Sequence, residues 1–240
     1  PVVPTCHYMM GGTPTNVNGQ AFTRINDKDE LIPGLFSAGE AACVSVHGAN
    51  RLGGNSLLDL VVFGRATGMH IQKELKSGGG VDSATRSDIK QSLDRLNKLN
   101  DSTEGFDPAE VKRELQECMQ NYFGVFRRGE FMKKGLDQLN EIKEKVDNLH
   151  LKDKSDAFNT SRVEAIELQN LFEVAEATAV SAYVRNESRG AHARDDFPER
   201  DDENWLCHTI FDPKNKEVSK RDVNFQPSKV EAFPPKVRTY

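Results

Sequence analysis

Arg51 lies in the stretch of this chain whose residue types are best suited to chemistry. It is surrounded by small and polar residues and directly precedes a predicted helix that runs into Leu-Leu-Asp-Leu-Val-Val-Phe. Gly53 and Gly54 permit a tight turn and a close approach of the backbone to a ligand. Asn55 or Ser56 would cap the helix, and an uncovered helix N-terminus attracts anions. The guanidinium can fork two N–H groups onto a carboxylate, although an ordinary helix start with a surface arginine also fits these residues.

Three further segments accompany the arginine stretch at residues 47–59. Residues 7–12 read His-Tyr-Met-Met-Gly-Gly, residues 33–40 read Pro-Gly-Leu-Phe-Ser-Ala-Gly-Glu, and residues 185–205 begin Arg-Asn-Glu-Ser-Arg-Gly-Ala-His-Ala-Arg. Taken in the order in which they occur along the chain, the four segments resemble the motifs of the succinate dehydrogenase and fumarate reductase flavoproteins. The resemblance extends over the whole chain.

The resemblance assigns roles to five residues. His7 and Arg51 match the residues of the family that bind the dicarboxylate substrate, succinate or fumarate. Glu40, Ser56 and Leu57 match its contacts with FAD, and helix-start N–H groups can stabilise negative charge on a reduced ring. Glu40 also follows a predicted buried strand, where ligands of α/β sheets bind. We expect the proton-acceptor arginine and the covalent-flavin histidine upstream, so no catalytic base is assigned within these residues.

Within the family, two features favour succinate dehydrogenase. Met10 follows a second methionine, and Leu57-Leu58-Asp59 follows the serine where fumarate reductases tend to read Leu-Ala-Glu. The implied protein oxidises succinate, passes electrons through an iron-sulfur subunit and membrane anchor subunits to quinone, and belongs to respiratory complex II. It would lie peripherally on the cytoplasmic face of a bacterial inner membrane, or on the matrix side in mitochondria. The alternatives are a quinol-fumarate reductase flavoprotein and a helical interaction module without redox chemistry.

The composition argues against a nucleic-acid-binding protein, a membrane span and a metal site. The chain has 240 residues, of which 37% are hydrophobic and 29% charged, with a net charge of −5. This balance is typical of a protein with a core and a solvated surface, and it shows no nucleic-acid footprint. No apolar run approaches the length of a membrane span. The four cysteines are scattered without a CxxC pair, so we expect free thiols and no metal site.

The chain also lacks the GxGxxG that opens a dinucleotide fold, which indicates the C-terminal portion of a longer polypeptide. We therefore expect an α+β chain with three parts. Residues 1–78 would form the end of a capping domain and the returning part of an FAD-binding α/β domain. Residues 82–184 would form an antiparallel helical bundle, and residues 185–240 an irregular C-terminal segment containing short strands.

Turn-forming residues and the periodicity of apolar residues predict the helices and strands. Glycine, proline and asparagine divide residues 1–45 into short strands, and Ser56 begins a helix that a glycine run ends after residue 76. Apolar residues then recur at helical spacing, with Asp107 as a cap before Pro108 and Asn159-Thr160-Ser161 at the start of the last helix, which runs to Val184. The predicted inward-facing residues include Ile89, Leu93, Leu96, Leu99, Val111, Leu115, Met119, Tyr122, Phe123, Phe126, Met132, Leu136, Leu139, Ile142 and Val146.

The remaining charged residues favour structural roles. Arg185, Arg189, His192 and Arg194 precede Asp195, Asp196, Asp201 and Asp202, a pattern typical of an ion-pair network. His47 is expected to pack or to form a hydrogen bond rather than to bind substrate. Short strands are predicted over residues 205–211 and 223–225.

Overall fold

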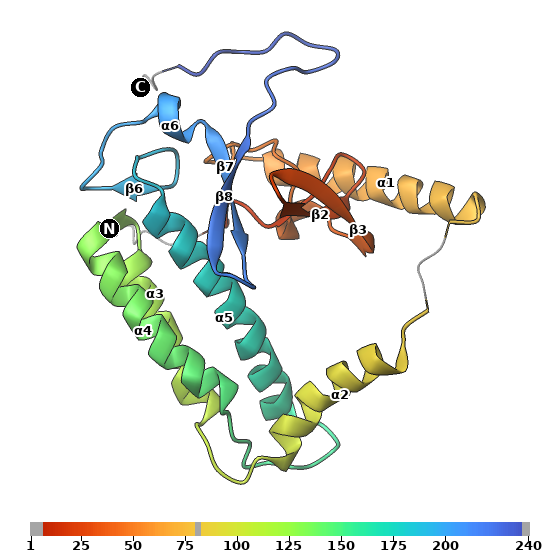
Figure 1. Ribbon diagram of the computed structural model, residues 1–240, viewed down its shortest axis with the longest axis vertical. Coiled ribbons are helices and arrows are strands. Elements are labelled where there is room, and N and C mark those ends of the chain that lie inside the picture. Colours follow the sequence, from red (N-terminus) through yellow and green to blue (C-terminus); the bar gives the residue numbers. More distant parts are fainter. Residues whose placement is uncertain (1–6, 80–82, 237–240) are drawn as a thin grey trace.

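The computed structural model describes residues 7–79 and 83–236 (Figure 1). Strands and helices occur in largely separate stretches of the chain, and the described strands pair in two-stranded sheets, which confirms the α+β class. Cys6 lies outside the described residues, and Cys43, Cys118 and Cys207 are free thiols. Among the described residues, no helix has the length and apolar character needed to cross a membrane.

Two small sheets precede the first long helix. Strands β1 (Thr13–Pro14) and β4 (Ala42–Cys43) pair in parallel, whereas β2 (Gln20–Ile25) and β3 (Lys28–Phe36) form an antiparallel hairpin. The hairpin turns at Asn26 and Asp27, whose φ angles of 49° and 62° are left-handed. Asparagine and aspartate tolerate this conformation, which matches the twist of a tight hairpin.

The expected buried strand at residues 35–40 is wrong. Strand β3 ends at Phe36, and Glu40 lies in a short 3₁₀ helix, η1 (Gly39–Ala41). Gly39 has a φ of 72°, and a side chain there would come within 2.3 Å of Leu60 Cδ2. The left-handed residue therefore ends the extended chain and lets it pass close to the following helix. Strand β3 is also mostly exposed, because β2 is its only neighbour among the described strands.

Helix α1 (Asn55–Lys76) starts one residue earlier than predicted. Its N-cap is Gly54, at a φ of 82°, and no described side chain caps it, so the predicted cap at Asn55 or Ser56 is wrong. Asn55 is already helical, and the Ser56 hydroxyl donates to Glu40 instead. The helix ends at Ser77 and Gly78 as the glycine run predicts.

Three helices form the bundle. Helices α3 (Pro108–Phe123), α4 (Gly129–Asp147) and α5 (Thr160–Val184) pack against one another, as Figure 1 shows. Asp107 and Asn159 cap α3 and α5 with their side chains, which confirms the predicted starts. The core is apolar and almost completely buried, and its largest members are Val111, Leu115, Met132, Ile142, Leu151, Leu168 and Phe172.

Helix α2 (Arg86–Asp101) belongs to the bundle only at its C-terminal end. Leu99 is buried in the core, but Ile89 and Leu93 are about half exposed, contrary to prediction. Arg95 fixes the helix to α5 through Gln169, Asn170 and a backbone carbonyl. A regular apolar period thus predicted the helix correctly but not how much of it packs.

The C-terminal segment packs against the helical bundle and against the strands of the N-terminal region. Strands β5 (Phe126–Arg127) and β6 (Ala193–Arg194) pair in parallel, and α6 (Asp202–Trp205) leads into the hairpin of β7 (Cys207–Asp212) and β8 (Glu217–Asp222). Phe126 lies in β5 and is exposed rather than inward-facing. The strand predicted at 223–225 is wrong, since pairing with β7 ends at Asp222.

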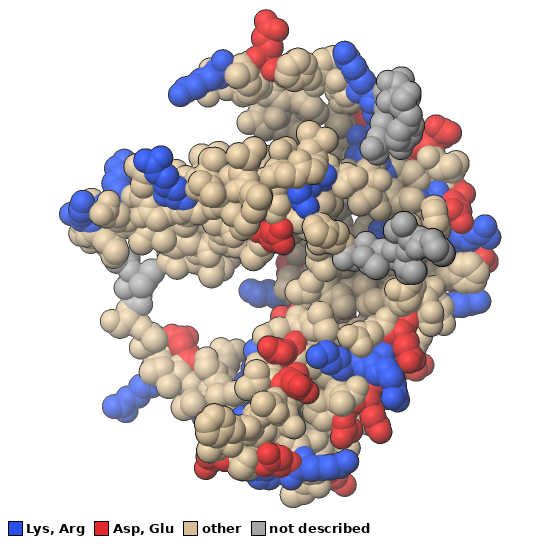
Figure 2. All heavy atoms as spheres, turned by 180° about the vertical axis from the view of Figure 1, so that it is seen from behind, with Lys and Arg blue, Asp and Glu red and all other residues tan. Residues whose placement is uncertain are grey.

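The β7–β8 hairpin connects the bundle with the N-terminal elements. It packs on α5, and Arg221 pairs with Asp29 of β3 at 2.7 Å while lying over the Phe22 ring (Figure 1). In Figure 2, α1 projects from the body and carries few charged side chains along most of its length.

Candidate functional site

Arg51 has the properties of an anion-binding side chain. Its guanidinium carbon lies 4.5 Å from the centre of the Tyr8 ring, a cation–π contact that orients the flat group. Its Nη1 donates to the Leu52 carbonyl at 3.3 Å. Its Nε is buried and has no hydrogen-bond partner among the described residues. No carboxylate among the described residues pairs with this guanidinium, so its charge is left for another anion.

Tyr8 connects the arginine to a buried acid–imidazole pair. Its ring contacts His47 edge-on with centroids 5.8 Å apart, and His47 Nε2 lies 2.8 Å from a carboxylate oxygen of Asp59. Asp59 is only 5% exposed. Burial, together with the charge of Asp59, raises the pKa of Tyr8, so its phenol stays neutral. His47 therefore has the packing and hydrogen-bonding place expected from the sequence.

The structure brings the segments of His7 and Arg51 together. His7 immediately precedes Tyr8, whose ring lies under the guanidinium, and the His7 side chain is exposed. His7 is thus next in sequence to the residue that stacks on Arg51, although 44 positions separate the two predicted substrate residues.

The three predicted cofactor residues meet where η1 faces the start of α1. The hydroxyl of Ser56, which is 8% exposed, donates to a carboxylate oxygen of Glu40. The Leu57 side chain is exposed, and its backbone N–H donates to the Gly54 carbonyl at 3.2 Å. The Glu40–Ser56 bond therefore ties the end of the strand region to the first turn of α1.

The C-terminal segment contains the expected ion-pair network, with a centre that the sequence did not reveal. Glu187 is completely buried and accepts from Arg185, from Arg189 and from the Asp201 backbone N–H. Burial alone would raise its pKa, but these donors lower the pKa below its usual range. Arg189 also pairs with Asp202 at 2.7 Å, and Arg194 with Asp196 at 2.7 Å.

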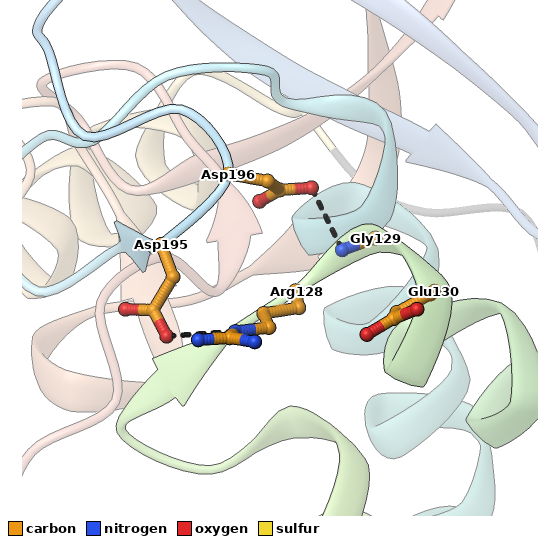
Figure 3. Close-up of a pocket in the computed structure, with 5 residues that line it drawn as sticks. All are labelled: Arg128, Gly129, Glu130, Asp195 and Asp196. Carbon is orange, nitrogen blue, oxygen red and sulfur yellow. Dashed lines mark hydrogen bonds and ion pairs between the residues drawn. The ribbon is translucent and has the colours of Figure 1, made fainter.

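A pocket of about 430 Å³ lies elsewhere, at the start of α4 (Figure 3). Figure 3 shows its charged groups engaged with each other: Arg128 pairs with Asp195 at 3.0 Å, and the Gly129 N–H donates to Asp196 at 2.8 Å. The hydrogen bonds from Arg194 hold the pKa of Asp196 well below its usual range. This hollow is therefore a junction between α4 and the C-terminal segment, in which Arg128, Asp195 and Asp196 already have partners.

Sequence reasoning missed Tyr8, Asp59 and Glu187. Tyr8 lies beside His7, to which the motif drew attention. The predicted ion-pair network named arginines, a histidine and aspartates but not Glu187. A usable signal existed for Asp59, since it is the lone acid in the first half of an otherwise apolar helix. Such an acid needs a partner when it is buried.

Two family models match the chain. Residues 112–240 match the C-terminal model of fumarate reductase flavoproteins, and residues 1–57 match an FAD-binding domain. Among curated relatives, the succinate dehydrogenase flavoprotein subunit of Coxiella burnetii is 51% identical over 99% of this chain. The match covers 40% of that relative, so the chain spans about two fifths of its length.

Solved structures agree with these matches. The flavoprotein of E. coli quinol fumarate reductase is 37% identical, with a TM-score of 0.83 over 100% of this chain and 40% of that one. A quinol-fumarate reductase solved with menaquinol is 36% identical, with a TM-score of 0.76 over 86% of this chain and 36% of that one.

The fold and the matches define a class, the flavin-dependent oxidoreductases. Within it, the chain belongs to the family of succinate dehydrogenase and fumarate reductase flavoproteins.

Proposed function

We propose that this chain is part of a flavoprotein subunit that oxidises succinate to fumarate, with His7 and Arg51 binding the dicarboxylate. The observation that supports it most is the guanidinium of Arg51, which stacks on the ring of Tyr8 and pairs with no carboxylate among the described residues. A substrate carboxylate supplies two acceptor oxygens in the plane of a guanidinium fork. The imidazole of His7, one residue before Tyr8, would hold the second carboxylate.

The residues near the start of α1 fit a flavin. Glu40 offers a carboxylate to a cofactor hydroxyl, and Ser56 and Leu57 lie at a helix start that no described side chain caps. Bound there, FAD supplies the hydride acceptor of the reaction. The chain's own contribution is to hold the substrate, because hydride transfer requires reacting atoms roughly 3–3.5 Å apart.

Exposed apolar residues on α1 support a longer polypeptide around this site. Leu58, Val61 and Val62 are 55–70% exposed, although they belong to the helix that carries Ser56. Contiguous apolar surface of this kind is usually covered by another element. We propose that the FAD-binding part of the protein covers it, and that residues 1–78, 82–184 and 185–240 are the three parts of the remainder.

The partners follow from the same proposal. Electrons leave the flavin through an iron-sulfur subunit and reach quinone in membrane anchor subunits, with this protein held peripherally on the cytoplasmic or matrix side. The structure of a relative with menaquinol supports a quinone-linked complex. Fumarate reduction is the second candidate, favoured by the 0.83 TM-score to the E. coli fumarate reductase flavoprotein. Rates of succinate oxidation and fumarate reduction by the purified complex separate the two.

The central test is Arg51→Lys in the full-length protein. Lysine keeps the charge but loses the planar fork, so the dianion would bind misaligned and succinate turnover should fall by about 100-fold or more. Flavin content should be unchanged, since the proposed cofactor residues lie elsewhere. Arg113→Lys, at an exposed arginine of α3, is the matched control and should turn over normally.

Near-normal turnover of Arg51→Lys would remove this residue from the substrate site. Loss of flavin at unchanged protein yield would instead reassign Arg51 to the cofactor.

A further inference from the structure

The loop that carries Arg51 is braced from the C-terminal segment. The Ala191 N–H donates to the carbonyl of Ala49 at 3.0 Å, two residues before Arg51. The approach is close at the neighbouring residue too, because a Cβ on Gly190 would lie 2.5 Å from that carbonyl oxygen. Two segments about 140 positions apart are therefore in backbone contact beside the candidate substrate residue.

The bracing element is a tight turn with a defined shape. Arg189 and His192 exchange two backbone hydrogen bonds, of 2.8 and 3.0 Å, around Gly190 and Ala191. Gly190 has a φ of 60°, which glycine adopts without strain. The turn approaches Ala49 with the Ala191 N–H and with Gly190, which has no side chain.

Buried charges hold the turn in place. Both oxygens of the Glu187 carboxylate are bonded to Arg189, at 2.8 and 2.9 Å, which fixes the first residue of the turn. Arg185 also donates to Glu187 and to the carbonyl of Trp205. Removing one partner of so buried a pair is costly, so the network resists displacement of the turn.

His192 fixes the other end of the turn to the bundle. Its Nδ1 lies 2.8 Å from Arg127 Nη1, and its Nε2 lies 3.1 Å from the Arg185 carbonyl. These contacts require a neutral imidazole that accepts at Nδ1 and donates at Nε2. The turn thus connects the helical bundle to the Arg51 loop.

We propose that the turn at residues 189–192 is a positioning element for Arg51, with Gly190 and Arg189 as positioning residues for the dicarboxylate site. Tyr8 orients the guanidinium. The Gly190–Ala191 backbone fixes the position of the Ala49 carbonyl and so of the loop that carries Arg51. The inference rests on the proposed function, because it requires Arg51 to bind a carboxylate.

The test uses the full-length flavoprotein and the variant Gly190→Ala. A Cβ at this position must move the Ala49 carbonyl, so the loop shifts while the fold around it stays. The matched control is Gly78→Ala: Gly78 has a φ of 77°, but no described atom lies within 4 Å of the position that a Cβ would take there. Both variants introduce the same left-handed strain, and only one touches the Arg51 loop.

Dicarboxylate binding is measured apart from turnover by titrating malonate and following the flavin absorbance. Gly190→Ala should raise the dissociation constant of malonate and the KM for succinate by about tenfold, the effect of weakening one charge-assisted hydrogen bond. Flavin content should equal that of Gly78→Ala. Arg189→Lys, which loses the fork onto Glu187 and adds no atom near Ala49, should give a smaller rise and serves if Gly190→Ala does not accumulate.

The outcomes are distinct. Malonate affinities of Gly190→Ala and Arg189→Lys equal to that of Gly78→Ala would overturn the positioning role while leaving the proposed function intact. A wild-type protein that neither binds malonate nor oxidises succinate would overturn both. A lower kcat with unchanged KM and malonate affinity would also contradict the proposal, because the turn would then act on something other than dicarboxylate binding.

Discussion

The helical bundle and the N-terminal region bury opposite kinds of residue. The bundle encloses a continuous apolar core, from Leu99 to Ala182. Between residues 7 and 79, the buried hydrophobic residues are Ala21, Phe22 and Ala42, and the buried polar ones are Thr15, Ser56, Asp59 and Thr67. Large apolar side chains of α1 are exposed. The bundle is thus stabilised by its own core, whereas the region of the candidate site is held by polar contacts and exposes apolar side chains of α1.

The largest expected effect is a core truncation in the bundle. Leu168 is 1% exposed and Leu58 is 63% exposed, so the same Leu→Ala change tests both regions. Leu168→Ala should cost about 2–5 kcal/mol, and Leu58→Ala in this chain less than about 0.5 kcal/mol, since alanine also favours a helix. Urea denaturation followed by circular dichroism measures both. Equal losses would contradict the comparison.

The same Leu58→Ala change in the full-length protein tests whether another part of the protein covers α1. If the FAD-binding part covers α1, the substitution there removes buried atoms and should cost about 2 kcal/mol or more. Leu168→Ala is the control, because its cost should be the same in both lengths of chain. An unchanged, near-zero cost of Leu58→Ala would show that α1 stays uncovered.

A smaller effect concerns pH and the turn that joins the two regions. Burial, with the charges of Arg127, Arg185 and Arg194 around the ring, lowers the pKa of His192 from 6.5 to about 4. The folded protein therefore binds fewer protons at this site than the unfolded chain between these values. The stabilisation is complete above pH 6.5 and is lost as the pH falls towards 4, by on the order of 1 kcal/mol after allowing for solvent screening.

Unfolding free energies measured across this pH range check the expectation. His192→Asn removes the titrating group, so its stability should change less between pH 6.5 and 4 than that of the wild-type protein. Parallel profiles of the two proteins would assign the pH dependence to other groups.

Local signals in the sequence predicted much of this fold. Asp107 before Pro108 marked the start of α3, and Asn159 marked α5, because caps act within one turn. Ends governed by pairing or close packing were harder to predict: β8 ends at Asp222 because its partner there, Cys207, is the first residue of β7, and Gly39 passes close to Leu60. Both partners lie beyond the single turn over which a cap acts.

In the candidate site, too, residue types could be predicted from the sequence but contacts between distant segments could not. Arg51, Glu40 and Ser56 were visible as residue types in motifs. No sequence pattern indicated that Tyr8 would stack on Arg51 or that Ala191 would bond to Ala49, since these contacts depend on how distant segments pack. The occupancy of His7, Arg51, Glu40, Ser56 and Leu57 by substrate and flavin stays a prediction.

The turn at Gly190 also has a consequence for the order of events during synthesis. Domains generally fold as units while the chain emerges from the ribosome. The bundle is complete once Val184 has emerged, but the Arg51 loop, made far earlier, receives its backbone brace from Ala191 and the β3 hairpin its ion pair from Arg221. Within residues 7–236, the Arg51 loop is therefore translated before the bundle but receives its backbone brace after it. A ribosome that stops shortly after residue 184 would release a stable bundle attached to an unfinished site.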